Sequence, residues 1–312
     1  MTRPTGRVPP RILAQASRRL LSHEQGTITK SREHKTTVAL AYPNSYYVGM
    51  SNLGFQCIYR LINDIPQALC ERAFLPDPEE QRELRRTRHP LFSLESSRPL
   101  RDFDMVAFSL SFENDYPAIL DVLELASIPL ARDRRNGTYP LIIAGGVCAF
   151  LNPEPLADFI DLFVIGEAEE VLPRLITAYH DHREQGTARE DMLAELARIE
   201  GIYVPSLYEV RYHPSGTIES FAPRGNATPR VRRAVAASLD RYPAQSAVIT
   251  PLTEFSNMFL LEVSRGCPYA CNFCCLGSVY RPVRKRSLAS LTAAATRAIT
   301  ANARIGLIGA TL

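Results

Sequence analysis

The sequence predicts an α/β fold, in which a doubly wound parallel sheet is followed by the start of a partial (β/α) barrel. From Thr36 to about His182, short apolar segments alternate with amphipathic segments, a pattern typical of strands and helices wound about a parallel sheet. A second alternation begins near Met258. Because the chain has 312 residues and 46% hydrophobic content, it can bury a sizeable core and is long enough for about two domains.

Composition and patterning divide the chain into four regions. The predicted regions are a basic N-terminal leader at 1–35, a Rossmann-type α/β domain at 36–182, a connector with short strands at 183–250, and the N-terminal part of the barrel at 251–312. The leader has no acidic residue before Glu24, as in organelle transit peptides, but a short basic helix over 11–22 is the favoured interpretation.

The strands and helices of the first domain are expected in alternating order. Strands are predicted at 38–41, 73–75, 105–110, 141–144 and 162–165, and helices at 52–63 and 114–126. Two of the strands end in glycines, Gly145 and Gly146 after one and Gly166 after the next. Ligands of such folds bind beyond the carboxyl ends of the strands. Glycine after a parallel strand often only serves a tight turn, so these glycines do not decide whether a ligand binds.

The connector is predicted to hold one polar helix and a hairpin. Its expected elements are a helix at 186–198 and strands at 201–205, 207–212 and 217–221. Arg224, Arg230, Arg232 and Arg233 add positive charge, in a scattered run typical of a solvated face. The barrel is expected to begin with a strand at 258–263, a helix at 288–301 and a strand at 305–308.

Three cysteines follow the first predicted barrel strand. Cys267, Cys271 and Cys274 stand at C-x3-C-x2-C spacing. A 4Fe–4S cluster usually takes four cysteine ligands, so a loop that offers three leaves one iron free for a substrate or cofactor. A zinc site would need a further ligand, and the nearest histidine in sequence, His213, is remote. A disulfide is disfavoured because the cysteines crowd together, and Cys275 is expected to be a buried thiol.

The cysteine spacing, the aromatic Phe273 and the lead-in Ser264-Arg265-Gly266 resemble the radical S-adenosylmethionine (radical SAM) enzymes. The resemblance implies that the three cysteines bind a 4Fe–4S cluster and that SAM binds the free iron. It implies that the reduced cluster splits SAM to a 5′-deoxyadenosyl radical, so the cofactor pair does the difficult step and the protein positions it. A flavodoxin or a ferredoxin would be the electron donor.

The same resemblance places part of a SAM site and indicates an incomplete barrel. Phe273 would lie near the adenine, and Gly309 and Ala310 stand where a turn that holds the SAM amino group begins. Only 55 residues run from Met258 to Leu312, whereas a full barrel takes about 250. The expectation is a fragment of a longer protein that is inactive on its own.

A second resemblance concerns the first domain. The segments 144–154 and 164–169 resemble the last two strand-to-helix turns of the cobalamin-binding domain that precedes many radical SAM barrels. The residues implied at this cleft are Asn44, Ser45, Gly145, Gly146 and Gly166. The cobalt-ligating Asp-x-His-x-x-Gly motif is missing, because 42–49 contains no histidine. Three interpretations stay open: cobalamin bound without a protein ligand to cobalt, another ligand, or a scaffold with an empty cleft.

The stretch 43–54 is unusually polar and aromatic for a strand-to-helix turn. In this it resembles a subfamily of these proteins known mainly from bacterial genomes, which does not indicate a substrate. The alternative interpretation is a capped helix start, in which Ser51 or Asn52 accepts a backbone N–H.

A basic run of Arg281, Arg284, Lys285 and Arg286 follows the cysteine motif. These side chains could attract the SAM carboxylate or a phosphate-bearing substrate, including a nucleic acid. Alternatively, they form a solvated loop leading to a helix that is capped by Ser287. The net charge of +3 does not by itself indicate a nucleic-acid binder.

The sequence therefore predicts a cytoplasmic radical SAM enzyme of unknown substrate. No apolar run reaches the roughly 18 residues that a membrane span needs, so no membrane partner is expected. Reduced thiols and an oxygen-labile cluster fit the cytoplasm. The competing interpretation is a non-enzymatic iron–sulfur module for electron transfer or sensing, which would need no SAM contact. No catalytic residue beyond the cofactor site is indicated.

Overall fold

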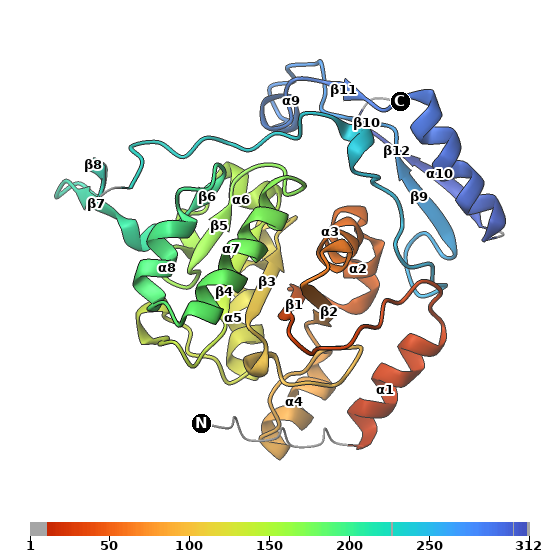
Figure 1. The fold of residues 1–312 in the computed structure, drawn as a ribbon, viewed down its shortest axis with the longest axis horizontal. Helices are drawn as coiled ribbons and strands as arrows, with labels where there is room; N and C mark the ends of the chain where they lie inside the picture. Colours follow the sequence, from red (N-terminus) through yellow and green to blue (C-terminus); the bar gives the residue numbers. More distant parts are fainter. Residues whose placement is uncertain (1–10, 226, 302, 311–312) are drawn as a thin grey trace.

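A six-stranded sheet lies at the centre of the protein (Figure 1). The structure is a computed structural model that describes residues 11–225, 227–301 and 303–310. The sheet order is β2-β1-β3-β4-β5-β6, with the first five strands in sequence parallel and β6 antiparallel to β5. The strands are β1 Thr36–Tyr42, β2 Ala68–Phe74, β3 Met105–Ser109, β4 Leu141–Gly145, β5 Leu162–Val164 and β6 Ile202–Tyr203.

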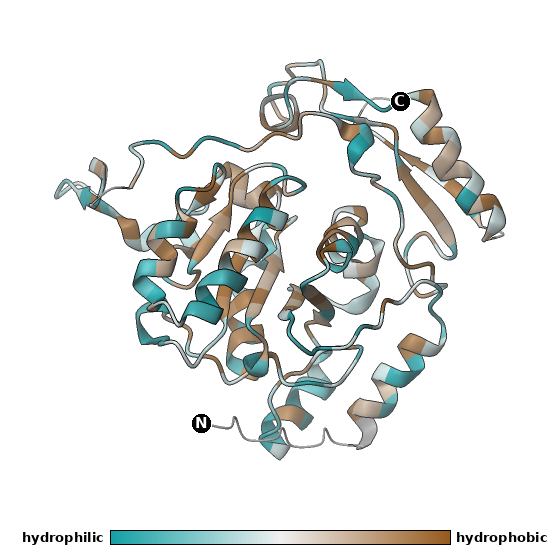
Figure 2. Cartoon of the chain, viewed as in Figure 1, coloured by the Kyte–Doolittle hydropathy of each residue, from teal (hydrophilic) through white to brown (hydrophobic). Residues whose placement is uncertain are grey.

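Helices cover both faces of this sheet. They are α1 Arg11–Ser22, α2 Tyr46–Ser51, α3 Leu53–Asp64, α4 Pro78–Thr87, α5 Tyr116–Leu125, α6 Val147–Leu151, α7 Val171–Gln185 and α8 Arg189–Leu196. Short 3-10 helices lie at Leu100–Asp102, Glu113–Asp115, Arg132–Arg134, Glu154–Leu156, Pro205–Leu207 and Leu239–Arg241. The strands are mostly hydrophobic in Figure 2, whereas the covering helices also carry hydrophilic residues.

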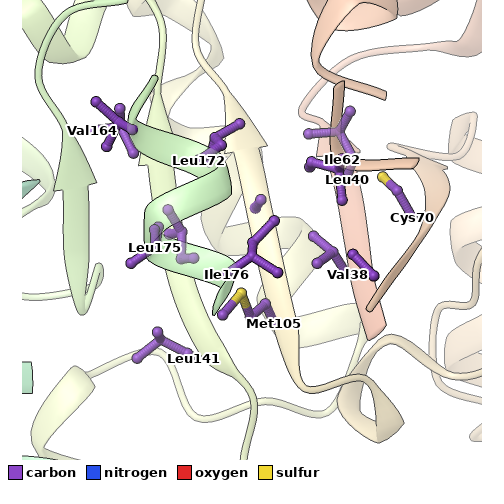
Figure 3. Packing of buried hydrophobic residues seen from close by; sticks show 14 of the residues in the cluster. Val38, Leu40, Ile62, Cys70, Met105, Leu141, Val164, Leu172, Leu175 and Ile176 are labelled. Carbon is purple, nitrogen blue, oxygen red and sulfur yellow. The ribbon is translucent and has the colours of Figure 1, made fainter. Parts of the chain in front are cut away.

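Alternate residues of β1 belong to two different cores. Val38 and Leu40 pack with α3 and α7, and Figure 3 shows Leu175 and Ile176 of α7 over the same face of the sheet. Ala39 and Ala41 point to the opposite face of the sheet, into a core built with α4 and α5. A strand that is buried on both faces is typical of a parallel sheet with helices on each side. The predicted doubly wound α/β fold is confirmed.

Most predicted elements of this region have the expected type and place, and the differences have physical causes. Strand β2 begins at Ala68, whereas the sequence pattern predicts a start at 73. The pattern misses the first part of the strand because two charged residues, Glu71 and Arg72, interrupt its apolar run, although both are buried in ion pairs. Helix α4 was not predicted. It is polar but begins with a capping box between Asp77 and Glu80. The segment predicted at 201–205 supplies β6, which joins the main sheet.

Arg72 is the centre of a buried charge cluster in the first core. Its side chain is 0% exposed and contacts Glu24 and Glu95, each at 2.7 Å. The guanidinium lies 4.7 Å from the centre of the Tyr59 ring, and Tyr46 donates a 2.6 Å hydrogen bond to Glu24. Burial raises the pKa of Glu95, although the charge of Arg72 opposes this shift. The cluster holds the segment after α1 against the sheet.

A second, smaller α/β unit follows the sheet. Its elements are β9 Met258–Glu262, β10 Ser264–Arg265, α9 Leu276–Val279, β11 Arg284–Lys285, α10 Leu288–Thr300 and β12 Arg304–Ile308. Strands β9 and β12 pair in parallel, and α10 connects them and packs on β9 through Ala294 and Ala298. This β-α-β unit agrees with the predicted start of a barrel. Figure 1 shows it beside the main sheet, in blue.

The segment between the two units contains a hairpin. Strands β7 Tyr208–Tyr212 and β8 Ile218–Pro223 pair antiparallel, with a register irregularity between Arg211 and Tyr212. In Figure 1 the hairpin projects from the sheet, and the chain then returns toward α9. The predicted helix at 11–22 is confirmed as α1, while Arg3 and Arg7 of the predicted leader lie outside the described residues. Among the described helices, none has the length and apolar character to cross a membrane.

Replacing Arg72 by leucine is expected to lower the free energy of unfolding by about 3–5 kcal/mol, because two carboxylates would stay buried without their cation. Urea denaturation measures this change. The matched control is Arg82→Leu on α4, where the side chain is 70% exposed and a change of about 0.5 kcal/mol or less is expected. Equal effects of the two substitutions would show that the buried cluster does not stabilise the fold.

Candidate functional site

The three predicted cluster cysteines lie in one loop, residues 266–283, which we call the cysteine loop. Strand β9 leads into it, and β10 and β11 close its base, with Ser264 opposite Lys285 and Arg265 opposite Arg284. The backbone N–H of Val263 donates to the last residue of β12 at 2.8 Å. The loop therefore leaves the carboxyl end of two parallel strands, which is where barrel enzymes place their active sites.

Two glycines let the cysteine loop fold back closely on itself. Gly266 has φ +93°, and a Cβ there would lie 2.2 Å from the carbonyl oxygen of Tyr280. A Cβ on Gly277 would lie 2.1 Å from the carbonyl oxygen of Tyr269. Any larger residue at 266 would need both a strained backbone and a displaced loop. The glycine of the Ser-Arg-Gly lead-in thus has a local structural role.

All of the thiols in the loop reach the surface. Cys271 is exposed, and Cys267 and Cys274 are partly exposed. Cys275 is also exposed, so the expectation of a buried thiol was wrong; it lies at the start of α9, on the outside of the loop. Within the described residues, no group of three or more His, Cys, Asp or Glu side chains is placed to hold a metal ion. Phe273 is 93% exposed.

Below the loop, three arginines and three glutamates form a network that we call the glutamate–arginine joint. Its members are Arg265, Arg284 and Arg286, with Glu167 and Glu169 from the turn after β5 and Glu262 from the end of β9. Arg265 contacts Glu169 at 2.7 Å, Glu262 at 2.9 Å and Glu167 at 3.3 Å. Arg284 donates to both oxygens of Glu167. Arg286 donates to Glu262 at 2.6 Å.

The joint connects the main sheet to both strands at the base of the cysteine loop. Glu167 also accepts a 2.7 Å hydrogen bond from the backbone N–H of Ala236. Burial alone would raise the pKa of Glu167, but hydrogen bonds from Arg284 and the charge of Arg265 outweigh it and hold the pKa below its ordinary value. A buried carboxylate that is shared by two guanidinium groups has few alternative partners, so the loop base has a defined position.

These contacts show how the basic residues after the cysteine motif are used. Arg284 and Arg286 are engaged by glutamates, so they are not free to bind an anion. The Ser287 side chain accepts from the N–H of Ser290 and caps α10, as one of the two interpretations predicts. Arg281 and Lys285 stay exposed.

The predicted SAM turn lies at the same edge as the cysteine loop. Ile308, the last residue of β12, is opposite Glu262, the last residue of β9. Gly309 and Ala310 follow directly, so the parallel pairing brings their backbone to the side of the sheet from which the cysteine loop leaves. Phe273, by contrast, points into solvent.

The predicted cleft residues Asn44 and Ser45 lie at the point where the strand order reverses, between β1 and β3. Ligands in such folds bind at this point. Here Asn44 donates to Asp115 at 3.0 Å, which joins the turn after β1 to the turn after β3. Ser45 caps α2 and Asn52 caps α3, which supports the capped-helix interpretation for Asn52. Ser51 does not cap a helix; it accepts from the N–H of Glu254.

The glycines of the predicted cleft are in contact with other backbone segments. A Cβ on Gly146 would lie 2.3 Å from the carbonyl oxygen of Leu110, and one on Gly166 would lie 2.2 Å from that of Ala234. Gly166 also forms a parallel bridge with Ala234. Gly145 is less constrained, because a Cβ there would meet the side chain of Val164 at an ordinary contact distance of 3.5 Å. Close packing explains the glycines at 146 and 166.

The glutamate–arginine joint was missed by sequence reasoning. Glu167 and Glu169 were noted only as part of a strand-to-helix turn, and Arg265 only as part of the cysteine lead-in. The joint connects distant positions, since Glu167 and Arg284 are 117 residues apart, and no local pattern reports such a contact. The one available signal was the pair of acidic residues directly after an apolar strand, where a ligand or a partner charge is expected.

Comparison with known proteins gives a family match ahead of the cysteine motif and one similar protein. Residues 54–205 match a family model described as radical SAM proteins, N-terminal. An uncharacterized protein of Methanocaldococcus jannaschii is 26% identical over 271 residues, which cover 85% of this chain and 46% of the relative. The chain thus spans about half the length of this relative. Both matches support the predicted resemblance to radical SAM proteins that have an N-terminal domain.

A solved structure is also similar to the chain. It is the radical S-adenosylmethionine methyltransferase TsrM from Kitasatospora setae, with a tryptophan substrate and the SAM analogue aza-SAM bound. The two share 16% identity with a TM-score of 0.47, and the similarity covers 86% of this chain and 46% of TsrM.

Substituting Glu167 by glutamine is expected to loosen the base of the cysteine loop. The lost charge-assisted hydrogen bonds are worth about 1.5–3 kcal/mol each, so amide hydrogen exchange in 264–265 and 284–286 should become at least about tenfold faster. Exchange measured by mass spectrometry tests this. Glu190→Gln, an exposed position on α8, is the matched control and should leave these amides unchanged. Unchanged exchange in Glu167→Gln would contradict the role of the joint.

The joint should also weaken in acid. Because the pKa of Glu167 is lowered in the folded protein, its stabilising effect is complete above the ordinary Glu pKa of about 4.3 and is lost as the pH falls through the lowered value. Exchange of the same amides, corrected for intrinsic rates, should therefore accelerate below about pH 4 in the wild type. In Glu167→Gln the corrected rates should vary much less with pH, and an identical pH profile in both proteins would refute this assignment.

Proposed function

We propose that this chain carries the 4Fe–4S loop of a radical SAM enzyme and that the cluster is held by Cys267, Cys271 and Cys274. The observation that supports this most directly is the position of the C-x3-C-x2-C loop, at the carboxyl end of β9 in a parallel β-α-β unit. The soft thiolate donors suit an iron–sulfur cluster. When bound, a reduced cluster supplies the electron for reductive cleavage of SAM to a 5′-deoxyadenosyl radical.

The residues around the loop would orient the cysteines and restrict their motion. The cysteine thiols share one loop but are not gathered, so we propose that the tip of the loop closes as the cluster binds, while its base stays fixed by the glutamate–arginine joint. In small metal sites, the protein ligands commonly reach their final positions only when the metal binds. Gly266 allows the tight turn at the base, and Gly309 and Ala310 lie at the edge where SAM would bind. Phe273 would turn toward the adenine.

For the N-terminal domain we propose a scaffold role rather than a cobalamin site. The polar groups at the β1–β3 reversal bond to one another, as Asn44 does with Asp115. The glycines at 146 and 166 are explained by backbone packing, and the turn after β5 holds the base of the cysteine loop through Glu167. Cobalamin would have to displace these contacts. Substrate and reaction type are outside this proposal.

An external one-electron donor, such as a flavodoxin or a ferredoxin, is part of the proposal, because reductive cleavage of SAM consumes one electron. The exposed thiols and an oxygen-labile cluster would require a reducing compartment such as the cytoplasm.

Anaerobic reconstitution with iron and sulfide tests the cluster site. About four irons per chain and a 4Fe–4S EPR signal in the reduced protein are expected, and both should be lost in Cys271→Ala. Cys275→Ala is the matched control, since the residue is an exposed cysteine of the same loop outside the motif, and it should keep its iron. Retention of iron in Cys271→Ala, or its loss in both variants, would contradict the assignment.

The same samples distinguish an enzyme from an iron–sulfur module for electron transfer or sensing. Adding SAM should change the EPR signal if SAM binds the free iron. A cluster whose signal is unaffected by SAM would instead support the non-enzymatic module.

A further inference from the structure

We propose that the β7–β8 hairpin and the residues 224–225 and 227–233 after it form a binding surface for single-stranded nucleic acid, with one base held in a cavity beside the cysteine loop. The proposal concerns binding, which needs neither cluster nor SAM, so it can fail or succeed independently of the proposed function.

The first observation is an aromatic cavity of about 350 Å³ beyond the carboxyl ends of β4 and β5. Its walls include Phe150, Glu154, Tyr203, Tyr208, Phe221 and Arg230. The volume is in the range of small-molecule sites, and apolar rings with a few polar groups are the usual lining of such sites. A flat heterocycle is the chemistry that suits these walls, because its faces stack on rings and its edge carries hydrogen-bonding groups.

The Glu154 carboxylate in the cavity is suited to hydrogen-bond with the edge of a nucleic-acid base. The Glu154 carboxylate accepts a 2.5 Å hydrogen bond from the hydroxyl of Tyr203 through one oxygen. Among the described residues none donates to the other oxygen, which can accept from an exocyclic amino group of a base.

The hairpin continues the aromatic surface away from the cavity. The rings of Tyr208 and Phe221 are stacked, with 5.1 Å between centroids and 24° between planes. Phe221 is 43% exposed, and farther along the hairpin Tyr212 is 60% exposed. Exposed rings such as these are platforms on which single-stranded bases can stack.

The second, independent observation is charge. Segment 224–233 contains four arginines and no acidic residue. Arg224, Arg230 and Arg232 are exposed, and within the described part of the chain no carboxylate pairs with their side chains. This differs from Arg265 and Arg284, which are held by glutamates. Guanidinium groups without a carboxylate partner, one of which, Arg230, lines the aromatic cavity, complement a phosphate backbone with bases attached. An acidic peptide would match the charge but not the rings.

The surface adjoins the cysteine loop. The ring of Phe150, which lines the cavity, is 5.8 Å from the ring of Tyr280 in an edge-on arrangement. Arg233 donates to the carbonyl oxygen of Arg281. A strand bound along 227–233 would therefore lead toward the cysteine loop.

Fluorescence anisotropy with a labelled single-stranded RNA of about 12 nucleotides tests the proposal, measured on the full chain between about 50 and 200 mM salt. In the variant Arg224→Gln/Arg230→Gln/Arg232→Gln, the slope of log Kd against log salt should fall by about 2, since each phosphate contact contributes about 0.7. The control Arg82→Gln/Arg134→Gln/Arg198→Gln removes the same charge from exposed arginines elsewhere and should keep the slope.

A second pair of variants tests stacking. Phe221→Ala should raise the Kd at least about fivefold, which corresponds to the lower end of the free energy of stacking one base on an aromatic ring. Phe112→Ala, which removes an exposed phenylalanine outside the surface, should leave the Kd unchanged. Four results would overturn the proposal: no binding by the wild type, an equal loss of slope in the control, displacement by polyglutamate as effective as by unlabelled RNA, or displacement by AMP at the same concentration as RNA nucleotides. The last would assign the cavity to a free nucleotide.

Discussion

The carboxylate of Glu167 is the group on which the geometry of the candidate site depends. It comes from the turn after β5 in the main sheet and binds arginines on both strands at the base of the cysteine loop. Each of these ions would be costly to bury alone, so they are buried only together. The loop that we propose to hold the cluster is therefore positioned by the first domain and not by the short barrel segment alone. The carboxyl edge of the sheet, which in related folds holds ligands, here holds a neighbouring part of the same chain.

This arrangement gives the N-terminal domain a clear physical role. Its strand-to-helix turns resemble those of cobalamin-binding domains. Their polar groups hydrogen-bond to one another, however, as Asn44 does with Asp115. Their glycines allow another backbone segment to approach closely, as Gly166 does for Ala234. A domain can thus retain the strand-to-helix turns of a ligand-binding fold while those turns pack against other parts of the chain instead of a ligand. Exposed rings lie instead on the β7–β8 hairpin, and within the described residues Arg224, Arg230 and Arg232 after it have no carboxylate partner.

Local pattern predicted most of the fold. Buried strands such as β1 and β3, the helix α1, and the β9-α10-β12 unit have periodicity and apolar content that depend only on neighbouring residues. Prediction was weaker where charge is buried: β2 was recognised only at its end because Arg72 lies inside it. For the site, spacing identified the cysteines, and the parallel pairing of β9 and β12 could be expected. The exposure of Cys275 and the partners of Arg265 depend on contacts with distant segments, which sequence alone does not contain.

The link between α1 and β1 has a consequence for how the chain folds. Glu24 binds the buried Arg72, and the next residue, Gln25, forms an antiparallel bridge with Ile249 through two 2.9 Å hydrogen bonds. The same short segment therefore contacts the sheet and a residue just ahead of β9. Such non-local pairing slows folding, because most of the chain must be present before the contact can form. During synthesis on the ribosome, the central sheet could assemble early, but the segment between α1 and β1 would gain all of its contacts only after residue 249 had emerged.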